Sequence, residues 1–280
     1  MIVTTQHDEY LSLGKKKKRP IALSRHNFDG IANKFDKNIY GTSKGQLRHR
    51  LLLGYLSKYL DCEHALTVLD AGGGTGMMSR DFAQRDHKVT LIDSSNDVLD
   101  IARERLKGFD NCSIIQTGIL DIDTAVATQT NFDLVLCHAV LEWLPNPFEV
   151  IQFIIDKLLK PSGILSLSFF NYDAMLLNNV LYGNFDYVKS GLKVRNTVRL
   201  NPHNPQKPQE VIQFIKQNTN AEVIHHAGIR CFHDYMLDKS KVEHEFEALY
   251  EMEKTYGSKA PYKWIGKYCH LLIKKTELKN

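Results

Sequence analysis

The residues whose types and spacing point most clearly to chemistry form a glycine-rich turn. The segment Val68–Ala71 is apolar apart from Asp70, and glycines follow at positions 72, 73, 74 and 76. Side chains in such a turn would block a ligand lying across a strand end, and glycine also permits unusual backbone angles. Ligands of open α/β sheets bind outside the carboxyl ends of the strands. The expected ligand contacts in this turn are Asp70, Gly72, Gly73 and Gly74.

The spacing of the glycines indicates which ligand the turn would bind. A dinucleotide fingerprint that began at Gly72 would need a third glycine at position 77, where the chain has Met77. A P-loop lysine is also absent. The alternate glycines 72, 74 and 76 after an acidic residue instead resemble the first motif of class I methyltransferases, which bind S-adenosylmethionine.

Asp93 follows the next apolar segment, Val89–Ile92, and is the second candidate ligand residue. A carboxylate at the end of the second strand can accept two hydrogen bonds from ribose hydroxyls. The alternative is an N-cap for the helix expected after Ser94. Strand context and the distance from Gly72 favour the ribose role.

The next strand ends carry weaker signals. Ile119 and Leu120 could pack on an adenine ring or simply be buried in a loop. His138 could be a general base, a cofactor contact or a structural histidine, of which we favour the cofactor contact. The Asp/Asn-Pro-Pro-aromatic motif of adenine-nitrogen methyltransferases is absent here. Cys137 lacks the Pro-Cys context of pyrimidine C5 enzymes, so we expect it to pack in the core.

Alternating strands and helices must position these residues. The pattern predicts an α/β fold with a parallel, doubly wound sheet, N-terminal helices within 27–60, and an insertion or lid at 171–206 after the fifth strand. The expected strands are 66–71, 88–92, 113–116, 132–137, 164–170, 222–229 and 268–274. The expected helices are 77–85, 98–106, 148–159, 208–217 and 242–255.

Composition sets the outer limits. The 280 residues are 43% hydrophobic and 24% charged, as in ordinary globular proteins, and the net charge of +4 does not by itself identify a nucleic-acid binder. Five cysteines without a Cys-x-x-Cys pair argue against a disulfide framework or a zinc knuckle, and no metal is expected. No apolar run has the length of a membrane span, and no signal peptide is recognised, so we expect a soluble cytoplasmic protein. We divide the chain into a flexible basic leader, 1–25, and one domain, 26–280.

Several segments outside the glycine turn are more particular. Together they closely resemble the bacterial tRNA 5-carboxymethoxyuridine methyltransferases, over roughly residues 27–274. The segments are Asn27–Asp29, Asn38–Thr42, Lys44–Arg48, His138–Trp143, Gly183–Val188 and Phe232–Tyr235.

The resemblance implies a Rossmann-like class I fold and S-adenosylmethionine-dependent methylation of a carboxylate. The acceptor would be 5-carboxymethoxyuridine at the wobble position, in the anticodon loop of a tRNA, and the product its methyl ester. Arg48 would grip the methionine carboxylate through two hydrogen bonds, although a solvated helix arginine is the alternative. The implied cofactor contacts are Arg48, Gly72, Gly73, Asp93, Ile119, Leu120 and His138.

A carboxylate acceptor is already ionised at neutral pH, so we expect no indispensable catalytic acid or base. Arg199 or Arg230 could orient the acceptor carboxylate. The residues expected to bind the substrate are Tyr40, Tyr187, Lys193, Arg195, Arg199 and Arg230, with Tyr182 as a further stacking candidate. The basic cluster of the insertion is thinner than in the family, and the lysine-rich leader is not a family feature.

Two alternative functions remain at this point. A small-molecule O-methyltransferase would share the sheet and use the insertion as an apolar cap, which the polar, basic insertion disfavours. A non-catalytic cofactor- or tRNA-binding protein is disfavoured by the intact Gly72, Gly74, Gly76 and Asp93. The pattern does not predict an oligomeric state.

Overall fold

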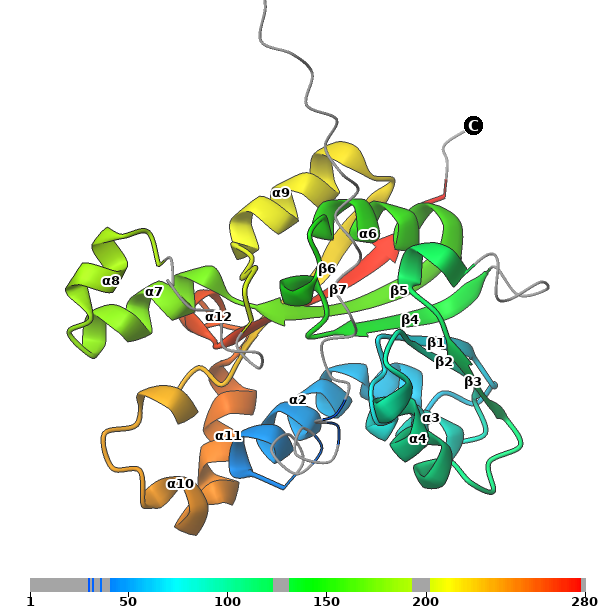
Figure 1. Ribbon diagram of the computed structural model, residues 1–280, viewed down its shortest axis with the longest axis horizontal. Coiled ribbons are helices and arrows are strands. Elements are labelled where there is room, and N and C mark those ends of the chain that lie inside the picture. Colours follow the sequence, from blue (N-terminus) through cyan, green and yellow to red (C-terminus); the bar gives the residue numbers. More distant parts are fainter. Residues whose placement is uncertain are drawn as a thin grey trace, which may run out of the picture.

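The computed structural model describes residues 30, 32, 36, 41–122, 131–192 and 202–277. In this part of the chain, seven strands form one sheet in the order β3-β2-β1-β4-β5-β7-β6 (Figure 1). The strands are β1 (Thr67–Ala71), β2 (Lys88–Asp93), β3 (Cys112–Gln116), β4 (Phe132–His138), β5 (Leu159–Phe170), β6 (Ala221–Ile229) and β7 (Tyr268–Lys275).

The direction of β7 differs from the parallel sheet that the sequence predicts. Strands β1 to β5 pair in parallel, but β7 lies between β5 and β6 and is antiparallel to both. The chain leaves β6 after Ile229, and Tyr268 pairs with both Ile229 and Phe170. Because the connection returns to the edge that it left, the last strand must run in the opposite direction. The start of β7 therefore lies at the carboxyl edge of the other strands.

Helices cover both faces of the sheet, as a doubly wound fold requires (Figure 1). On one face, a buried cluster joins the sheet to α6 and α9 through side chains such as Ile151 and Ile215. On the other, Leu47, Phe82 and Leu249 join it to α2, α3 and α11, respectively. The helices are α2 (Ser43–Leu60), α3 (Met77–Ala83), α4 (Asn96–Arg105), α6 (Pro147–Phe153), α9 (Pro208–Asn218) and α11 (Phe246–Tyr256).

The segment after β5 forms two helices where it is described, α7 (Tyr172–Leu181) and α8 (Phe185–Lys189). Asn171 begins α7, and its side-chain oxygen accepts hydrogen bonds from the amides of Asp173 and Ala174. The role of residues 171–206 as a lid stays a prediction. The leader lies outside the described residues, and of the first expected N-terminal helix only residues 30, 32 and 36 are described, of which 32 and 36 are helical.

The helix expected at 242–255 is divided into α10 (Lys241–His244) and α11, with Glu245 between them in a non-helical conformation. The short α12 (Tyr262–Ile265) then leads into β7. Throughout the described ranges, no helix is both long enough and apolar enough to cross a membrane.

Candidate active site

The glycine turn lies at the carboxyl edge of the sheet, between β1 and α3. The amides of Gly72 and Gly73 donate to the carbonyl of Ile92 at 2.9 and 3.1 Å, which ties the turn to the end of β2. Gly72 has a φ of +74°, and a Cβ there would lie 2.6 Å from Cγ2 of Val140. Glycine is therefore required at this position by both the backbone angle and the available space.

Asp70 lies beneath this turn. It is buried, and its carboxylate accepts a 2.7 Å hydrogen bond from the hydroxyl of Ser79 on α3. A Cβ at position 73 would lie 2.7 Å from Cγ of Asp70, so carboxylate and turn are in close contact. Burial raises the pKa of Asp70 to about 6, with a contribution from the charge of Asp93. This geometry is that of a residue that orders the loop.

Asp93 is held in a defined orientation at the end of β2. Its Oδ2 accepts a hydrogen bond from the amide of Gly74 at 3.1 Å, and its Oδ1 accepts one from the amide of Ser95 at 2.9 Å. Each carboxylate oxygen has more than one acceptor position, so these bonds leave capacity for two ribose hydroxyls. Asp93 also resembles a helix cap, which was the alternative role, because its bond to the amide of Ser95 lies just before the first residue of α4.

The predicted adenine contacts lie in a short 3-10 turn, Ile119–Asp121. Ile119 is buried, whereas 41% of the Leu120 side chain is exposed. An exposed apolar side chain can pack against a flat ring, and the contact between Leu120 and the adenine ring stays a prediction.

His138 ends β4 and lies close to Arg48. Its Nε2 is 2.8 Å from the hydroxyl of Ser166, which is itself 2.9 Å from Nε2 of His270. Its Nδ1 is buried and has no hydrogen-bond partner among the described residues. Burial, with the nearby charge of Arg48, lowers the pKa of His138 to about 3. Such a histidine is a poor proton acceptor, so the geometry favours a cofactor contact over a general base.

Arg48 projects from α2 over the start of β7. Its Cζ lies 5.3 Å from the ring centre of Tyr268, a cation–π distance. Among the described residues it forms no salt bridge within 4.0 Å. A half-buried guanidinium of this kind fits the predicted role of binding the methionine carboxylate.

Two of the predicted substrate residues, Tyr187 and Arg230, lie in the described part of the chain. Tyr187 is half-buried on α8. Arg230 follows β6 with a φ of +63°, and its guanidinium binds the carboxylate of Asp234 through Nε and Nη2. Only Nη1 is left outside that ion pair, so the orienting role of Arg230 stays a prediction. The remaining candidates, Tyr40, Lys193, Arg195 and Arg199, lie outside the described residues.

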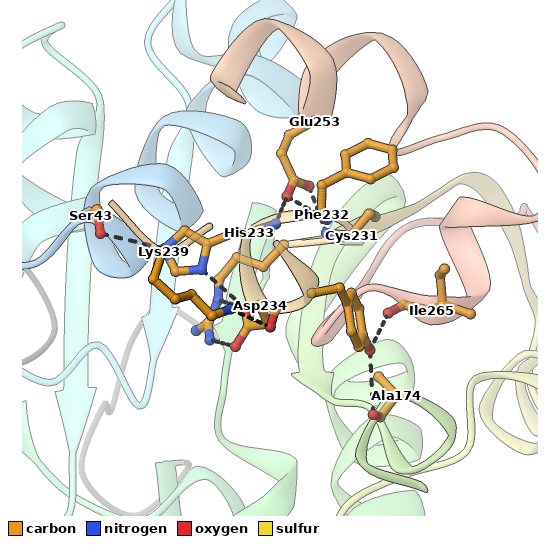
Figure 2. A network of polar contacts seen from close by, with 11 residues as sticks. Ser43, Ala174, Cys231, Phe232, His233, Asp234, Lys239, Glu253 and Ile265 are labelled. Carbon is orange, nitrogen blue, oxygen red and sulfur yellow. Dashed lines mark hydrogen bonds and ion pairs between the residues drawn. The ribbon is translucent and has the colours of Figure 1, made fainter. Parts of the chain in front are cut away.

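A network around the loop after β6 was not predicted (Figure 2). The fully buried carboxylate of Glu253, on α11, accepts hydrogen bonds from the consecutive amides of Cys231, Phe232 and His233 at 2.7–3.0 Å. Tyr235 donates to the carbonyl of Ile265 at 3.0 Å. These bonds fix the backbone of the Phe232–Tyr235 segment just after the end of β6. The sequence carries no local pattern that predicts the role of Glu253, because the three amides that it binds lie 20 to 22 residues earlier in the chain.

Glu142 is a second residue that the sequence reading missed. It lies just after β4 in a 3-10 turn and is 1% exposed. Neither carboxylate oxygen has a hydrogen bond of normal geometry among the described residues, although the amides of Glu142 and Phe170 face it. Burial raises the pKa of Glu142 to about 7 against those amides and the charge of Arg48. The site thus holds a carboxyl that titrates near neutrality.

In the described ranges, no three His, Cys, Asp or Glu side chains are grouped so that they could hold a metal ion. The donor set instead fits an adenosyl amino acid. The glycine turn, which has no room for side chains, fits the extended methionine portion of such a ligand. The oriented carboxylate of Asp93 fits its ribose, and the half-buried Arg48 fits its carboxylate.

Comparison with known proteins agrees with this geometry. Residues 63–247 match a family model described as a methyltransferase domain. The chain is 39% identical over 263 residues to the tRNA 5-carboxymethoxyuridine methyltransferase of Escherichia coli K12. The matched region covers 92% of this chain and 99% of that protein. It is 36% identical over 120 residues to a ubiquinone biosynthesis O-methyltransferase of Xanthomonas oryzae pv. oryzae, covering 42% of this chain and 48% of that one.

Solved structures share the fold at low identity. The plantazolicin methyltransferase BamL, in complex with a triazolic desmethylPZN analogue and SAH, has a TM-score of 0.55 at 14% identity, and the match covers 88% of this chain and 90% of that one. A putative methyltransferase in complex with the Haloferax volcanii Trm112 activator has a TM-score of 0.56 at 17% identity, covering 89% and 99%. The family model and the 39% identity over nearly the whole length of both chains place this chain in the family of tRNA 5-carboxymethoxyuridine methyltransferases, which are S-adenosylmethionine-dependent enzymes.

Proposed function

We propose that this chain methylates the carboxylate of 5-carboxymethoxyuridine at the tRNA wobble position. The observation that carries the proposal is the 39% identity that spans 92% of this chain and 99% of the Escherichia coli relative. The match to the ubiquinone-pathway enzyme covers 42% of this chain, so a small-molecule acceptor has weaker support.

The site supports a reaction without proton transfer. Bound S-adenosylmethionine supplies an electrophilic methyl group on a sulfonium centre. The acceptor carboxylate is ionised at neutral pH and attacks directly. The protein's residues have to hold both groups in line and exclude water. Arg48, Asp93 and the glycine turn would hold the donor, and His138, neutral because its pKa is about 3, would contact it without taking a proton.

The tRNA would approach the carboxyl edge beside α7 and α8. Tyr182 and Phe185, at the junction of these helices, are 63% and 57% exposed and can stack on unpaired bases. Lys189 is exposed at the end of α8. Residues 171–206 would thus act as a substrate-binding insertion, with Tyr187 lining it and Tyr40, Lys193, Arg195 and Arg199 as further predicted contacts. Such a protein would work in the cytoplasm, where tRNA is modified.

The experiment that tests the function is mass spectrometry of tRNA nucleosides from cells that lack the gene. Loss of the methyl ester with accumulation of free 5-carboxymethoxyuridine is the expected result. An unchanged profile in cells shown to contain the precursor would refute the tRNA substrate. Purified protein with S-adenosylmethionine and precursor-bearing tRNA should then restore the ester, with a rate that falls as salt is raised.

A further inference from the structure

Lys267 lies at the edge of the sheet where ligands bind, although the sequence reading does not single it out. Its carbonyl accepts from the amide of Asn171, just after β5, at 3.1 Å. Its own amide donates to the carbonyl of Arg230, just after β6, at 3.3 Å. The backbone of Lys267 is therefore fixed between two strand ends on the β5–β7–β6 half of the sheet. Gly72, Asp93 and His138 lie on the other half, at the ends of β1, β2 and β4.

The side chain of Lys267 is a half-buried cation without a fixed counterion. Its Nζ lies 5.0 Å from the ring centre of Phe170. In the described ranges it forms no salt bridge within 4.0 Å and no side-chain hydrogen bond, whereas the neighbouring Arg230 is bound at two points by Asp234. Burial lowers the pKa of Lys267, which the charge of Asp234 opposes and that of Arg230 reinforces. An anion bound there would regain the stabilisation that the ammonium lacks.

The charges around this position balance in favour of an anionic ligand. Arg48 and Arg230 both lie over the ring of Tyr268, at 5.3 and 5.9 Å, and Lys267 precedes that tyrosine in the chain. The nearby acids are Asp234, which is committed to Arg230, Glu253, whose carboxylate accepts from three backbone amides, and Glu142, whose pKa is raised to about 7. If Arg48 binds the methionine carboxylate, Lys267 is the cation that remains around Tyr268, among the described residues, for a second carboxylate.

We propose that Lys267 binds the carboxylate of the acceptor nucleoside and orients it toward the methyl donor. This inference rests on the proposed function. The ammonium would donate to one carboxylate oxygen, while the other oxygen forms the new bond to the methyl carbon. The bond from that carbon to sulfur breaks, its electron pair stays on sulfur, and no proton is released. The product ester is neutral, so it loses the charge-assisted hydrogen bond and is released more readily.

The test uses Lys267→Met and Lys267→Arg, with Lys259→Met as the matched control because Lys259 is exposed and near in sequence. Precursor-bearing tRNA comes from cells lacking the gene, and ester-bearing tRNA from the parent strain. We expect Lys267→Met to lower kcat/KM by about 10- to 100-fold, the loss of one charged hydrogen bond. Lys267→Arg should recover part of the lost kcat/KM, and Lys259→Met should have the kcat/KM of the wild type.

Binding measured with S-adenosylhomocysteine separates the acceptor carboxylate from other anions. The wild type should bind precursor tRNA more tightly than ester tRNA, and Lys267→Met should remove that preference while binding unmodified tRNA normally. Equally weakened binding of all three tRNAs would mean a phosphate contact and would overturn the proposal. So would a preference that survives in Lys267→Met, or loss of S-adenosylhomocysteine binding in both variants, which would show a structural role. A wild type that never methylates precursor tRNA would instead refute the proposed function itself.

Discussion

Arg230 and Asp234 form a two-point ion pair at the carboxyl edge of the sheet, with Nε of the arginine 2.7 Å from Oδ2 of the aspartate. Both side chains are largely buried, 12% and 18% exposed. Burial opposes ionisation of Asp234, but hydrogen bonds from His233 and Arg230 hold its pKa well below the ordinary value. The pair ties Arg230, just after the end of β6, to the Phe232–Tyr235 segment.

Asp234→Ala should destabilise the fold, because it leaves the Arg230 guanidinium buried without its partner. The free energy of unfolding should fall by roughly 2–4 kcal/mol in urea titrations. Asp100→Ala, which breaks an exposed pair with Arg103, should change it by less than about 1 kcal/mol. Equal small losses in the two variants would show that the buried pair does not stabilise the loop.

Asp93→Ala should weaken binding of S-adenosylhomocysteine by about 100-fold or more, since two charge-assisted hydrogen bonds to ribose would be lost. Isothermal titration calorimetry measures this directly. The control is again Asp100→Ala, on the exposed face of the following helix. Unchanged affinity in a folded Asp93→Ala protein would exclude the ribose contact and leave only the turn-ordering bonds to Gly74 and Ser95.

Glu142→Gln should change how stability depends on pH. The folded pKa of Glu142, about 7, lies above the unfolded value near 4.5, so the native state binds the extra proton between these values. The contribution of Glu142 to stability is therefore present at low pH and lost as pH rises through 7. Glutamine does not titrate. The free energy of unfolding of the variant, relative to that of the wild type, should therefore rise by about 2 kcal/mol between pH 5 and pH 8.

Urea unfolding at both pH values provides the measurement for Glu142. Because the other titrating groups are common to the two proteins, their contributions cancel in the difference. A difference that stays constant with pH would show that the Glu142 carboxyl is not protonated in the native state near neutrality.

Tyr182→Ala should weaken tRNA binding through loss of one base-stacking platform. Stacking on an aromatic ring contributes about 1–3 kcal/mol per base, which corresponds to roughly 5- to 150-fold in affinity. Tyr256→Ala, at a ring that is 38% exposed on α11, serves as the control. If Tyr182→Ala left the dissociation constant for tRNA unchanged, the junction of α7 and α8 would not be a stacking surface.

The glycine turn and the carboxylate at the next strand end could be located from the sequence because both are encoded locally. A strand, a glycine turn and a carboxylate at the next strand end occupy contiguous residues from Val68 to Asp93. Their geometry follows from strand polarity and the limited space at the turn, which the structure shows as the close approach of Gly72 to Val140. The hydrophobic alternation likewise located the strands, and the helices cover both faces as predicted.

The arrangement of side chains on the β5–β7–β6 half of the edge was decided by tertiary structure. Apolar periodicity locates a strand at 268–274 but does not encode its direction, and it is the antiparallel course of β7 that carries Lys267 to the ligand edge. The sequence likewise suggested Arg230 from its charge, but the pairing with Asp234 depends on a left-handed backbone at Arg230. That loop is held by Glu253 from another helix. Contacts between segments that are distant in the chain form only once the fold brings them together. Local pattern therefore locates the glycine turn and Asp93, whereas only the fold brings Lys267 and Tyr268 beside Arg230.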